Sequence, residues 1–364
     1  RLPRRAGQGQ WGPPPPPAPL CPLDEGHPRP APPAPPAPKP AQARDGRALI
    51  DATKPFAAES TAESWRHLFT VMALLAGGTA VAAMAPWWPV RLAMAVLDGL
   101  LIVRLFIVYH DHMHGALLKD SKLAKIILSI YGVLVMAPPR VWRETHNYHH
   151  AHTAQIVGSH IGSYPVVTVE MWKKMKPADR LKYRVVRHPI TVLLGYVPIF
   201  MIGMCVNSLR KSVVRYWDSA AALLVNWTLT AGLIYFAGLT TAFFTFLLPL
   251  MVACASGAYL FYAQHNFPDM TLQPRHQWTY SKAALESSSY MELGPVMQWL
   301  TGNIGFHHVH HLNPLIPFYK LPDAMASIPE LQHPGVTTLS PSAIAACFRL
   351  KLWDPQQGKM VGYP

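Results

Sequence analysis

Six apolar segments follow one another along the chain, separated by polar or proline-containing stretches of very different length. Runs of about 20 apolar residues are typical of helices that cross a lipid bilayer. The pattern therefore predicts an all-α integral membrane protein. The segments cover residues 67–88, 92–109, 123–137, 190–206, 219–239 and 241–263.

Length decides which of these segments cross the bilayer. Segment 123–137 reaches roughly 22 Å as a helix, against a hydrocarbon core of about 30 Å. If it crossed, the histidine-rich stretches on its two sides would face opposite compartments and could not share a metal. We expect this segment to lie in the interface or inside protein, and we expect segment 190–206 to be re-entrant or to lie at the surface.

The four remaining segments predict two transmembrane helical hairpins. The first joins 67–88 to 92–109 and turns at Pro86 and Pro89, and the second joins 219–239 to 241–263. Lys and Arg are frequent near the histidines, whereas the two tight turns hold only Arg91, so the positive-inside rule places the histidines on the cytoplasmic face. The expected fold is two hairpins with interfacial helices and a cytoplasmic cap that carries the histidines.

Composition favours a membrane protein over a nucleic-acid-binding protein. Half of the 364 residues are apolar and 14% are charged. The net charge of +13 would suit nucleic acid or an anionic membrane face, and the long apolar runs decide for the membrane. The four cysteines are scattered without a CxxC pair, which argues against a disulfide framework and against a thiolate metal site.

The N-terminal part differs from the rest of the chain. Up to Pro40 it is rich in proline and lacks hydrophobic periodicity, which is typical of disorder or polyproline II. We expect a disordered segment at 1–55 and a membrane domain at 60–364. A role in binding proline-specific domains stays open for the tail.

Three short stretches hold most of the 18 histidines. The first, YHDHMHG, ends an apolar segment, and its His110 and His114 are four residues apart and thus share a helix face. His112 points roughly the opposite way and is left out of the expected ligand set. Asp111 is placed to accept a hydrogen bond from the second ring nitrogen of a ligand histidine, which would fix its tautomer.

The other two stretches share the spacing HxxHH, at His146–His150 and at His307–His311. On a helix the three rings converge, while the adjacent pair diverges by about 100°, which suits two neighbouring metals. At this histidine content about 0.04 such matches are expected by chance, so two matches indicate metal binding. Imidazole alone does not name the metal, but eight histidines exceed the needs of one tetrahedral zinc and imply two metals.

With these boxes the chain resembles the membrane fatty acid desaturases, which carry HxxxH, HxxHH and HxxHH boxes around two helical hairpins. The resemblance covers roughly residues 60–364. The stretches that look like the Δ12-type acyl-lipid branch are HNYHHAHT, GSYPVVTVE, QHNFPD, ESSSYMELGPVMQWLTGNIGFHHVHHLNPLIPFYKLP and LWDPQQGKMVGY.

The resemblance implies two irons, oxygen as co-substrate and one more ligand before the third box, where this chain has His265. An asparagine that holds a metal-bound water in acyl-CoA relatives is replaced here by Phe261, and Gln264 or Asn303 are candidates for its role. The nine expected iron ligands are His110, His114, His146, His149, His150, His265, His307, His310 and His311.

The expected reaction is oxygen-dependent desaturation of a fatty acyl chain carried on a lipid, CoA or ACP. The chain has no dinucleotide fingerprint, haem motif or iron–sulfur cysteine set, so electrons must come from a carrier such as ferredoxin or cytochrome b5 with its reductase. The basic stretch Lys173–Arg187 is expected to face such an acidic carrier or anionic lipid.

Two alternatives remain open. A di-iron hydroxylase or ketolase of a lipid or carotenoid would use the same iron, because HDxMHG also looks like carotenoid ketolases. A non-enzymatic histidine-rich metal transporter is the second alternative. Its histidines should form low-complexity repeats in a loop, whereas this chain has ordered spacing.

Two ionisable residues inside an apolar segment, and several further histidines, are not assigned to the metal site. Asp98 and Arg104 fall at membrane depth, where we expect a structural pair inside the bundle. Among the remaining histidines, His152, His160 and His308 are expected behind the ligands or at the surface, and His27, His67 and His333 are expected as background.

Overall fold

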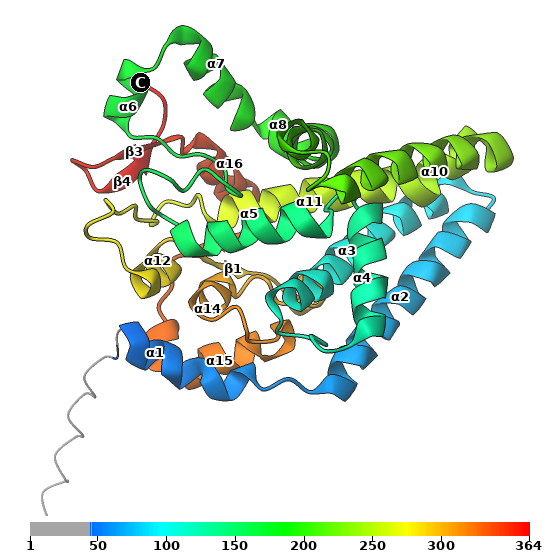
Figure 1. The fold of residues 1–364 in the computed structure, drawn as a ribbon, viewed down its shortest axis with the longest axis horizontal. Coiled ribbons are helices and arrows are strands. Elements are labelled where there is room, and N and C mark those ends of the chain that lie inside the picture. The colour runs from blue at the N-terminus through cyan, green and yellow to red at the C-terminus, as the bar shows by residue number, and fades with distance from the viewer. Residues whose placement is uncertain (1–43, 45) are drawn as a thin grey trace, which may run out of the picture. The chain divides into compact units, whose positions relative to one another are not determined.

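The computed structural model describes Arg44 and residues 46–364. The expected disorder of the proline-rich tail falls on residues 1–43 and 45, which lie outside the described residues. Within the described part the chain is mostly helical, as predicted (Figure 1).

The expected end of the disordered segment at residue 55 is wrong. Gly46–Thr53 forms helix α1, and Lys54–Ala57 forms the 3-10 turn η1. Leu49 of α1 is buried, and Asn313 Nδ2 donates to Thr53 Oγ1 at 2.8 Å. Helix α1 is thereby anchored to the loop that follows the third histidine stretch.

In the described part of the chain, three helices are long and apolar enough to cross a membrane: α2 (Thr61–Met84), α3 (Trp88–His114) and a merged helix over Trp217–Gln264. Helices α2 and α3 are roughly 36 and 40 Å long at about 1.5 Å per residue, more than the hydrocarbon core of about 30 Å. The merged helix is interrupted at Gly238, where φ is 85°. It consists of α10 (Trp217–Ala242), η3 (Phe243–Leu247) and α11 (Leu248–Gln264).

Helix α3 packs against α2 and against α11. Gly99 allows the close approach to α11, because a Cβ atom there would lie only 2.6 Å from Val252 Cβ. The segment η3 contacts both α2 and α3. In Figure 1 the turn between α2 and α3 and the far end of α10 lie at the same side of the molecule, away from the histidine-bearing helix α14.

The two shorter apolar segments form short or broken helices. Helix α4 (Lys122–Leu134) is about 20 Å long and meets α5 (Pro139–His152) at a bend of 90°. Segment 190–206 is divided between α8 (Pro189–Leu193) and the π-helix η2 (Tyr196–Val206). None of these helices alone spans a hydrocarbon core of about 30 Å, although α4 and α5 together have the length and composition of a broken span or re-entrant loop.

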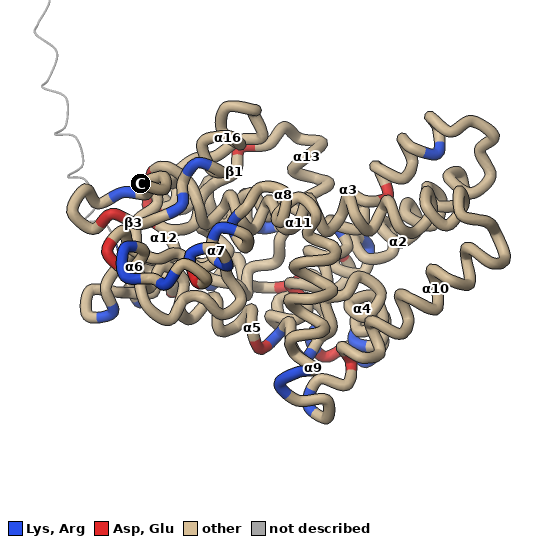
Figure 2. Tube along the Cα trace, turned by 90° about the horizontal axis from the view of Figure 1, so that it is seen from above, with Lys and Arg blue, Asp and Glu red and all other residues tan. Residues whose placement is uncertain are grey.

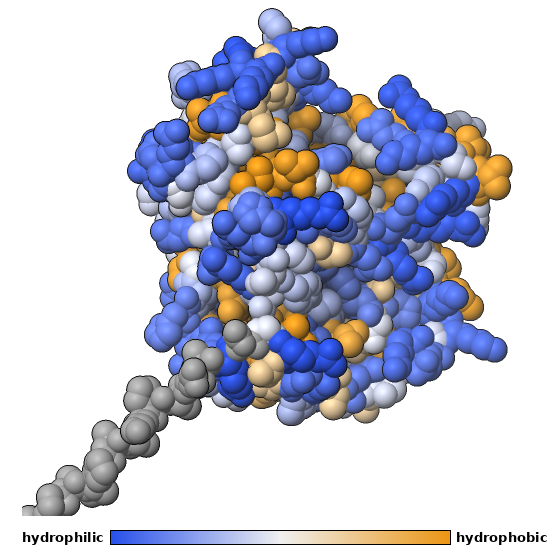
Figure 3. All heavy atoms as spheres, turned by 60° about the vertical axis from the view of Figure 1, so that its left-hand side comes forward, coloured by the Kyte–Doolittle hydropathy of each residue, from blue (hydrophilic) through white to orange (hydrophobic). Residues whose placement is uncertain are grey.

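The remaining elements form a cap of short helices and two-stranded sheets around the histidines. Figure 3 shows that this side of the molecule is covered mainly by hydrophilic residues. The strand β1 (Tyr290–Glu292) is parallel to β2 (Val336–Thr338), and β3 (Leu352–Asp354) is antiparallel to β4 (Lys359–Val361). The short helices are α6 (Val169–Lys174), α7 (Pro177–Val186), α9 (Asn207–Lys211), α12 (Tyr280–Glu286), α13 (Pro295–Leu300), α14 (His307–Leu312), η4 (Phe318–Lys320), α15 (Leu321–Ser327), η5 (Pro329–Leu331) and α16 (Pro341–Arg349).

The expected pair of Asp98 and Arg104 is wrong. Asp98 Oδ2 accepts a hydrogen bond of 3.0 Å from Thr79 Oγ1 of α2. Arg104 donates to the main-chain oxygen of Trp299 and lies 3.9 Å from the centre of its indole ring. Six residues correspond to a rotation of about 600° along a helix, so the two side chains point to different sides and meet different partners.

The basic stretch lies over α6 and α7, where Figure 2 shows Lys and Arg gathered, whereas the hairpin part carries few charges. Lys173, Lys174 and Lys182 are exposed. The expectation that Arg187 joins this surface is wrong, because it is fully buried and donates to Pro165 O at 2.8 Å and to Asn266 Oδ1 at 2.6 Å. It follows the last residue of α7, where the chain turns inward.

Candidate metal centre

Four segments bring the predicted histidines together in the interior. The first lies at the C-terminal end of α3, which stops at Gly115 in the left-handed conformation with φ of 80°. The second is the last half of α5, the third is the residue directly after α11, and the fourth is α14. The bend of 90° between α4 and α5 returns the second stretch to the first, so segment 123–137 does not separate them.

The nine predicted histidines fall into two groups, each able to hold one metal ion. In each group the facing ring nitrogens all lie within 4.8 Å of one another. Group one contains His110, His114, His146, His150 and His310, and group two contains His149, His265, His307 and His311.

The adjacent histidines of each HxxHH stretch divide between the groups, as their helical spacing predicts. His149 belongs to group two and His150 to group one, and in α14 His311 and His310 divide in the same way. The groups are direct neighbours, because the rings of His150 and His311 stack at 4.2 Å with 19° between their planes. The arrangement is that of two adjacent metal sites.

Group two forms a closed ring of four Nε2 atoms. Its sides are 3.0 Å from His149 to His265, 2.9 Å from His265 to His307, 3.1 Å from His307 to His311 and 3.3 Å from His311 back to His149. The centre of a square with such sides would lie about 2.2 Å from each corner, near the distance of roughly 2.0–2.1 Å found between metal and imidazole nitrogen. The four rings fit a metal ion without rearrangement.

Two histidines have their tautomers set by partners that only accept. His265 Nδ1 lies 3.0 Å from the main-chain oxygen of Ser287, and His110 Nδ1 lies 2.8 Å from Asp111 Oδ1. Both Nδ1 atoms therefore carry the proton, which leaves the Nε2 lone pair directed into the group. The predicted contact of Asp111 with a ligand histidine is present, and the Phe318 N–H donates to its other oxygen at 2.7 Å.

The electrostatics of the cap also favour metal binding. Burial lowers the pKa of His265 to about 4 and holds the pKa of His307, His310 and His311 well below the usual range. These rings are neutral at pH 7 and have lone pairs to offer. The set contains only imidazoles, which suit iron, copper, nickel and zinc.

The histidines left out of the ligand set have other partners. His112 Nδ1 lies 3.0 Å from Leu117 O, and His308 Nε2 lies 3.0 Å from Leu331 O. His152 stacks on Tyr148. His160 is exposed. His67, expected as background, is half-buried and contacts Arg104.

The two amide candidates differ in their surroundings. Gln264 lines a cavity beside the histidines, and its Nε2 donates to Ile304 O at 2.7 Å. Asn303 donates to Phe318 O at 3.2 Å and is not among the residues that line this cavity. The sequence analysis did not identify Ser163, whose Oγ lies 2.5 Å from His149 Nδ1. Ser163 belongs to the stretch GSYPVVTVE, which carries part of the family resemblance.

A cavity of about 470 Å³ reaches the metal centre from the apolar part of the molecule. Its histidine end is lined by His110, His146 and His307. The walls are apolar and come from α3, α4, α5, η2 and α11; among them are Phe106, Trp142, Phe200, Leu250, Cys254 and Phe261. Its size and lining suit an apolar ligand.

Comparison with known proteins decides the family. The model of the fatty acid desaturase family matches residues 85–341. The chain belongs to the fatty acid desaturase family. It is 34% identical over 277 residues to a fatty acid desaturase of Bacillus subtilis, an alignment that covers 75% of this chain and 77% of the relative.

More distant relatives carry more specific names. An sn-1 oleoyl-lipid 12-desaturase of Synechocystis is 22% identical over 280 residues, covering 75% of this chain and 77% of the relative. An sn-1 acyl-lipid omega-3 desaturase (ferredoxin) of the same organism is 26% identical, covering 74% and 76%. As a member of this family the desaturase is an oxidoreductase.

Replacing His149 by alanine should remove metal from group two. We expect purified His149→Ala protein to hold about half of the wild-type iron or less, since the ring of four Nε2 atoms loses the member that closes two of its sides. The matched control is His152→Ala, three residues along the same helix, which should keep the wild-type iron content. Elemental analysis of both variants makes the comparison, and full iron content in His149→Ala would contradict the assignment.

Proposed function

We propose that the desaturase inserts a double bond into a fatty acyl chain, using oxygen at two irons held by the nine histidines. The observation that carries the proposal is the apolar cavity that ends at His110, His146 and His307. An acyl chain is the substrate that such a cavity suits, because its lining is mainly aliphatic and aromatic.

Group one would hold one iron and group two the other. When bound, the two irons supply the oxygen activation that attack on an unactivated C–H bond requires. His110 and His265 would enter as Nδ1-protonated imidazoles, since Asp111 and Ser287 hold their outer nitrogens. Such contacts keep a ligand ring oriented and raise its basicity.

The residues around the cavity exclude water and orient the chain. Trp142 stacks on His146 with ring centres 4.3 Å apart, and Phe261 packs against His149 at 4.9 Å. These rings close the sides of the metal centre, so the acyl carbons that lie beside the histidines are confined by aromatic walls. Gln264 offers an amide at the same end of the cavity and is the better candidate of the two amides for holding a water.

The proposed topology is two transmembrane hairpins, formed by α2 with α3 and by α10 with α11. Two observations support it. The hairpin ends lie at one side of the molecule (Figure 1), and their turns expose Trp87 and Trp88 in the first and Tyr235 and Phe236 in the second. Aromatic side chains are enriched where membrane meets water. With Lys and Arg concentrated on the cap, the histidines would face the cytoplasm (Figure 2).

Electrons would come from an acidic carrier of the ferredoxin or cytochrome b5 type. The exposed basic residues of α6 and α7 support a docking site, because they lie at the end of the molecule opposite the hairpin turns, in reach of a soluble protein (Figures 1 and 2). Arg187 at the end of α7 donates to Asn266, the neighbour of His265. The buried Arg187 thus connects the end of α7 to the neighbour of a group-two histidine.

A hydroxylase or ketolase would use the same histidines, and the product distinguishes it from a desaturase. A transporter is disfavoured by the geometry. Three of the four group-two histidines are buried, the outer nitrogens of His149 and His265 contact Ser163 and Ser287, and the adjoining cavity is apolar. A transport route needs polar walls.

The reaction itself is tested by a lipid profile. Expression in a host without polyunsaturated lipids, supplied with ferredoxin and its reductase, should yield a new acyl double bond, identified by gas chromatography and mass spectrometry. His310→Ala, a group-one variant, serves as the inactive control. A hydroxylated or keto product, or no lipid product with an iron-loaded protein, would overturn the proposal.

Charge reversal tests the docking surface. Lys173→Glu/Lys174→Glu should raise the KM for ferredoxin roughly tenfold at low salt with little change in kcat, since electrostatic attraction steers the encounter. The control Arg275→Glu/Lys282→Glu makes the same change in charge at two exposed residues outside α6 and α7. Equal effects of both pairs, or an effect that added salt does not diminish, would contradict docking at α6 and α7.

A further inference from the structure

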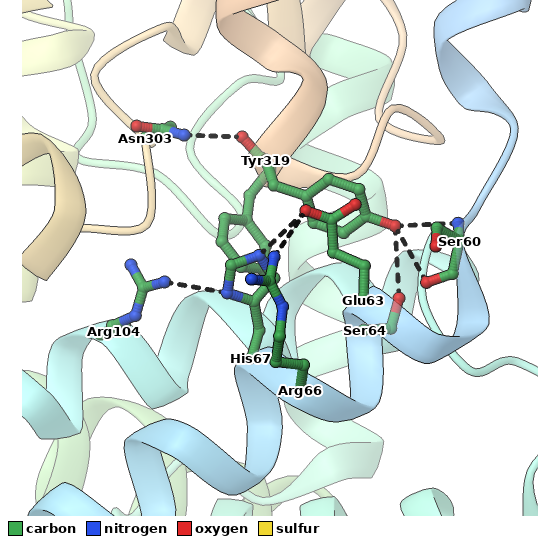
Figure 4. Close-up of polar contacts among 9 residues, drawn as sticks. Ser60, Glu63, Ser64, Arg66, His67, Arg104, Asn303 and Tyr319 are labelled. Carbon is green, nitrogen blue, oxygen red and sulfur yellow. Dashed lines mark hydrogen bonds and ion pairs between the residues drawn. The ribbon is translucent and has the colours of Figure 1, made fainter.

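His67 has no role in the proposed reaction, but its ring contacts residues of both α3 and η4. It comes from α2, and its Nδ1 lies 3.2 Å from Arg104 Nη2 of α3 (Figure 4). A guanidinium only donates, so His67 Nδ1 accepts and the neutral ring carries its proton on Nε2. That nitrogen faces Glu63 Oε1 at 3.7 Å. The ring is therefore fixed at one edge by Arg104.

Arg104 is itself held in place. It is 3% exposed, donates to Trp299 O and stacks on the Trp299 ring. A buried guanidinium loses several kcal/mol of hydration and needs acceptors, so its position is set by the acceptors that surround it. Among the described residues its one side-chain acceptor is His67.

The ring of His67 supports the two aromatic residues of η4. Its centre lies 5.0 Å from the Phe318 ring and 5.3 Å from the Tyr319 ring, the latter nearly parallel at 29°. The turn is also tied to the start of α2, because Ser60 N–H donates to Tyr319 Oη at 3.0 Å (Figure 4). Asn303 Nδ2 donates to Phe318 O from the other side. The peptide groups of η4 are thereby fixed in direction.

The direction of one of these peptide groups matters for the metal centre. The Phe318 N–H donates to Asp111 Oδ2 at 2.7 Å, and Asp111 Oδ1 holds His110 Nδ1 at 2.8 Å. Asp111 is 1% exposed, so few other groups can hold its carboxylate. His110 is the member of group one that also lines the acyl cavity from α3.

We propose that His67 is a positioning residue for the group-one metal, acting through Phe318 and Asp111 on the orientation of His110. This inference rests on the proposed di-iron function. A shift of η4 would move the Phe318 N–H, release Asp111 and let the His110 ring rotate, which changes the ligand field of one metal and leaves group two unaffected. No ligand of group two is bonded to this network.

Mössbauer spectra of protein loaded with ⁵⁷Fe test the proposal without reference to turnover. Wild-type protein should show two iron environments. Asp111→Asn, which weakens the contact to His110 directly, identifies the component that belongs to group one. His67→Leu should change that same component, and the double variant should show no further change, because both substitutions act on one chain of contacts.

Conservative variants separate positioning from general stability. His67→Asn places an amide oxygen near the position of Nδ1 and should restore the wild-type spectrum, whereas His67→Gln places it near Nε2 and should not. This pair also decides the matter if His67→Leu does not fold. Thr70→Ala, an exposed position three residues along α2, is the surface control.

Each outcome is decisive. Wild-type protein without two irons would overturn the proposed function itself. Two irons in the wild type, with Asp111→Asn altering one component and the His67 variants altering neither, would overturn the positioning role alone. A change of both components in His67→Gln, or equal spectra of His67→Asn and His67→Gln, would also count against it.

Discussion

The structure depends on nine imidazole rings whose inner nitrogens face one another in a dry interior. In group two the four Nε2 atoms form a ring with sides of 2.9 to 3.3 Å, and at least His265 points a lone pair into it. Lone pairs that face one another repel, and a cation between them removes that repulsion, so the arrangement favours a bound metal. The long helices, the bend and the caps serve to bring these rings together.

Each element contributes one part of that convergence. The left-handed Gly115 ends α3 directly after His114, the bend of 90° turns α5 back towards α3, and α14 presents its adjacent histidines to both groups. The cavity reaches the centre from the apolar part of the molecule, and Val186 at the end of α7 is among its lining residues. The exposed basic residues of α6 and α7 lie at the end of the molecule opposite the hairpin turns (Figures 1 and 2).

Local spacing made much of the site predictable. The division of His149 from His150, and of His310 from His311, follows from a rotation of about 100° per helical residue, and the contact of Asp111 with His110 is between sequence neighbours. His265 was predicted only through the resemblance, since no spacing connects it to the boxes. The long helices were predicted because apolar length is itself a local property.

The errors all concern partners that are distant in sequence. Asp98 meets Thr79, Arg187 meets Asn266, and His67 meets Arg104 and the rings of η4, and no periodicity reports such contacts. Helix α1 was missed for the same reason, because Leu49 and Thr53 are buried by residues near the other end of the chain. The sequence indicates that charged residues in apolar surroundings are structural, but only the fold shows which residues they contact.

X-ray absorption at the iron edge of the purified protein tests the central claim most directly. Two irons per chain, each in a shell of imidazole nitrogen, would agree with two neighbouring all-histidine sites. One metal per chain, or a shell in which carboxylate oxygen or sulfur predominates, would contradict the account.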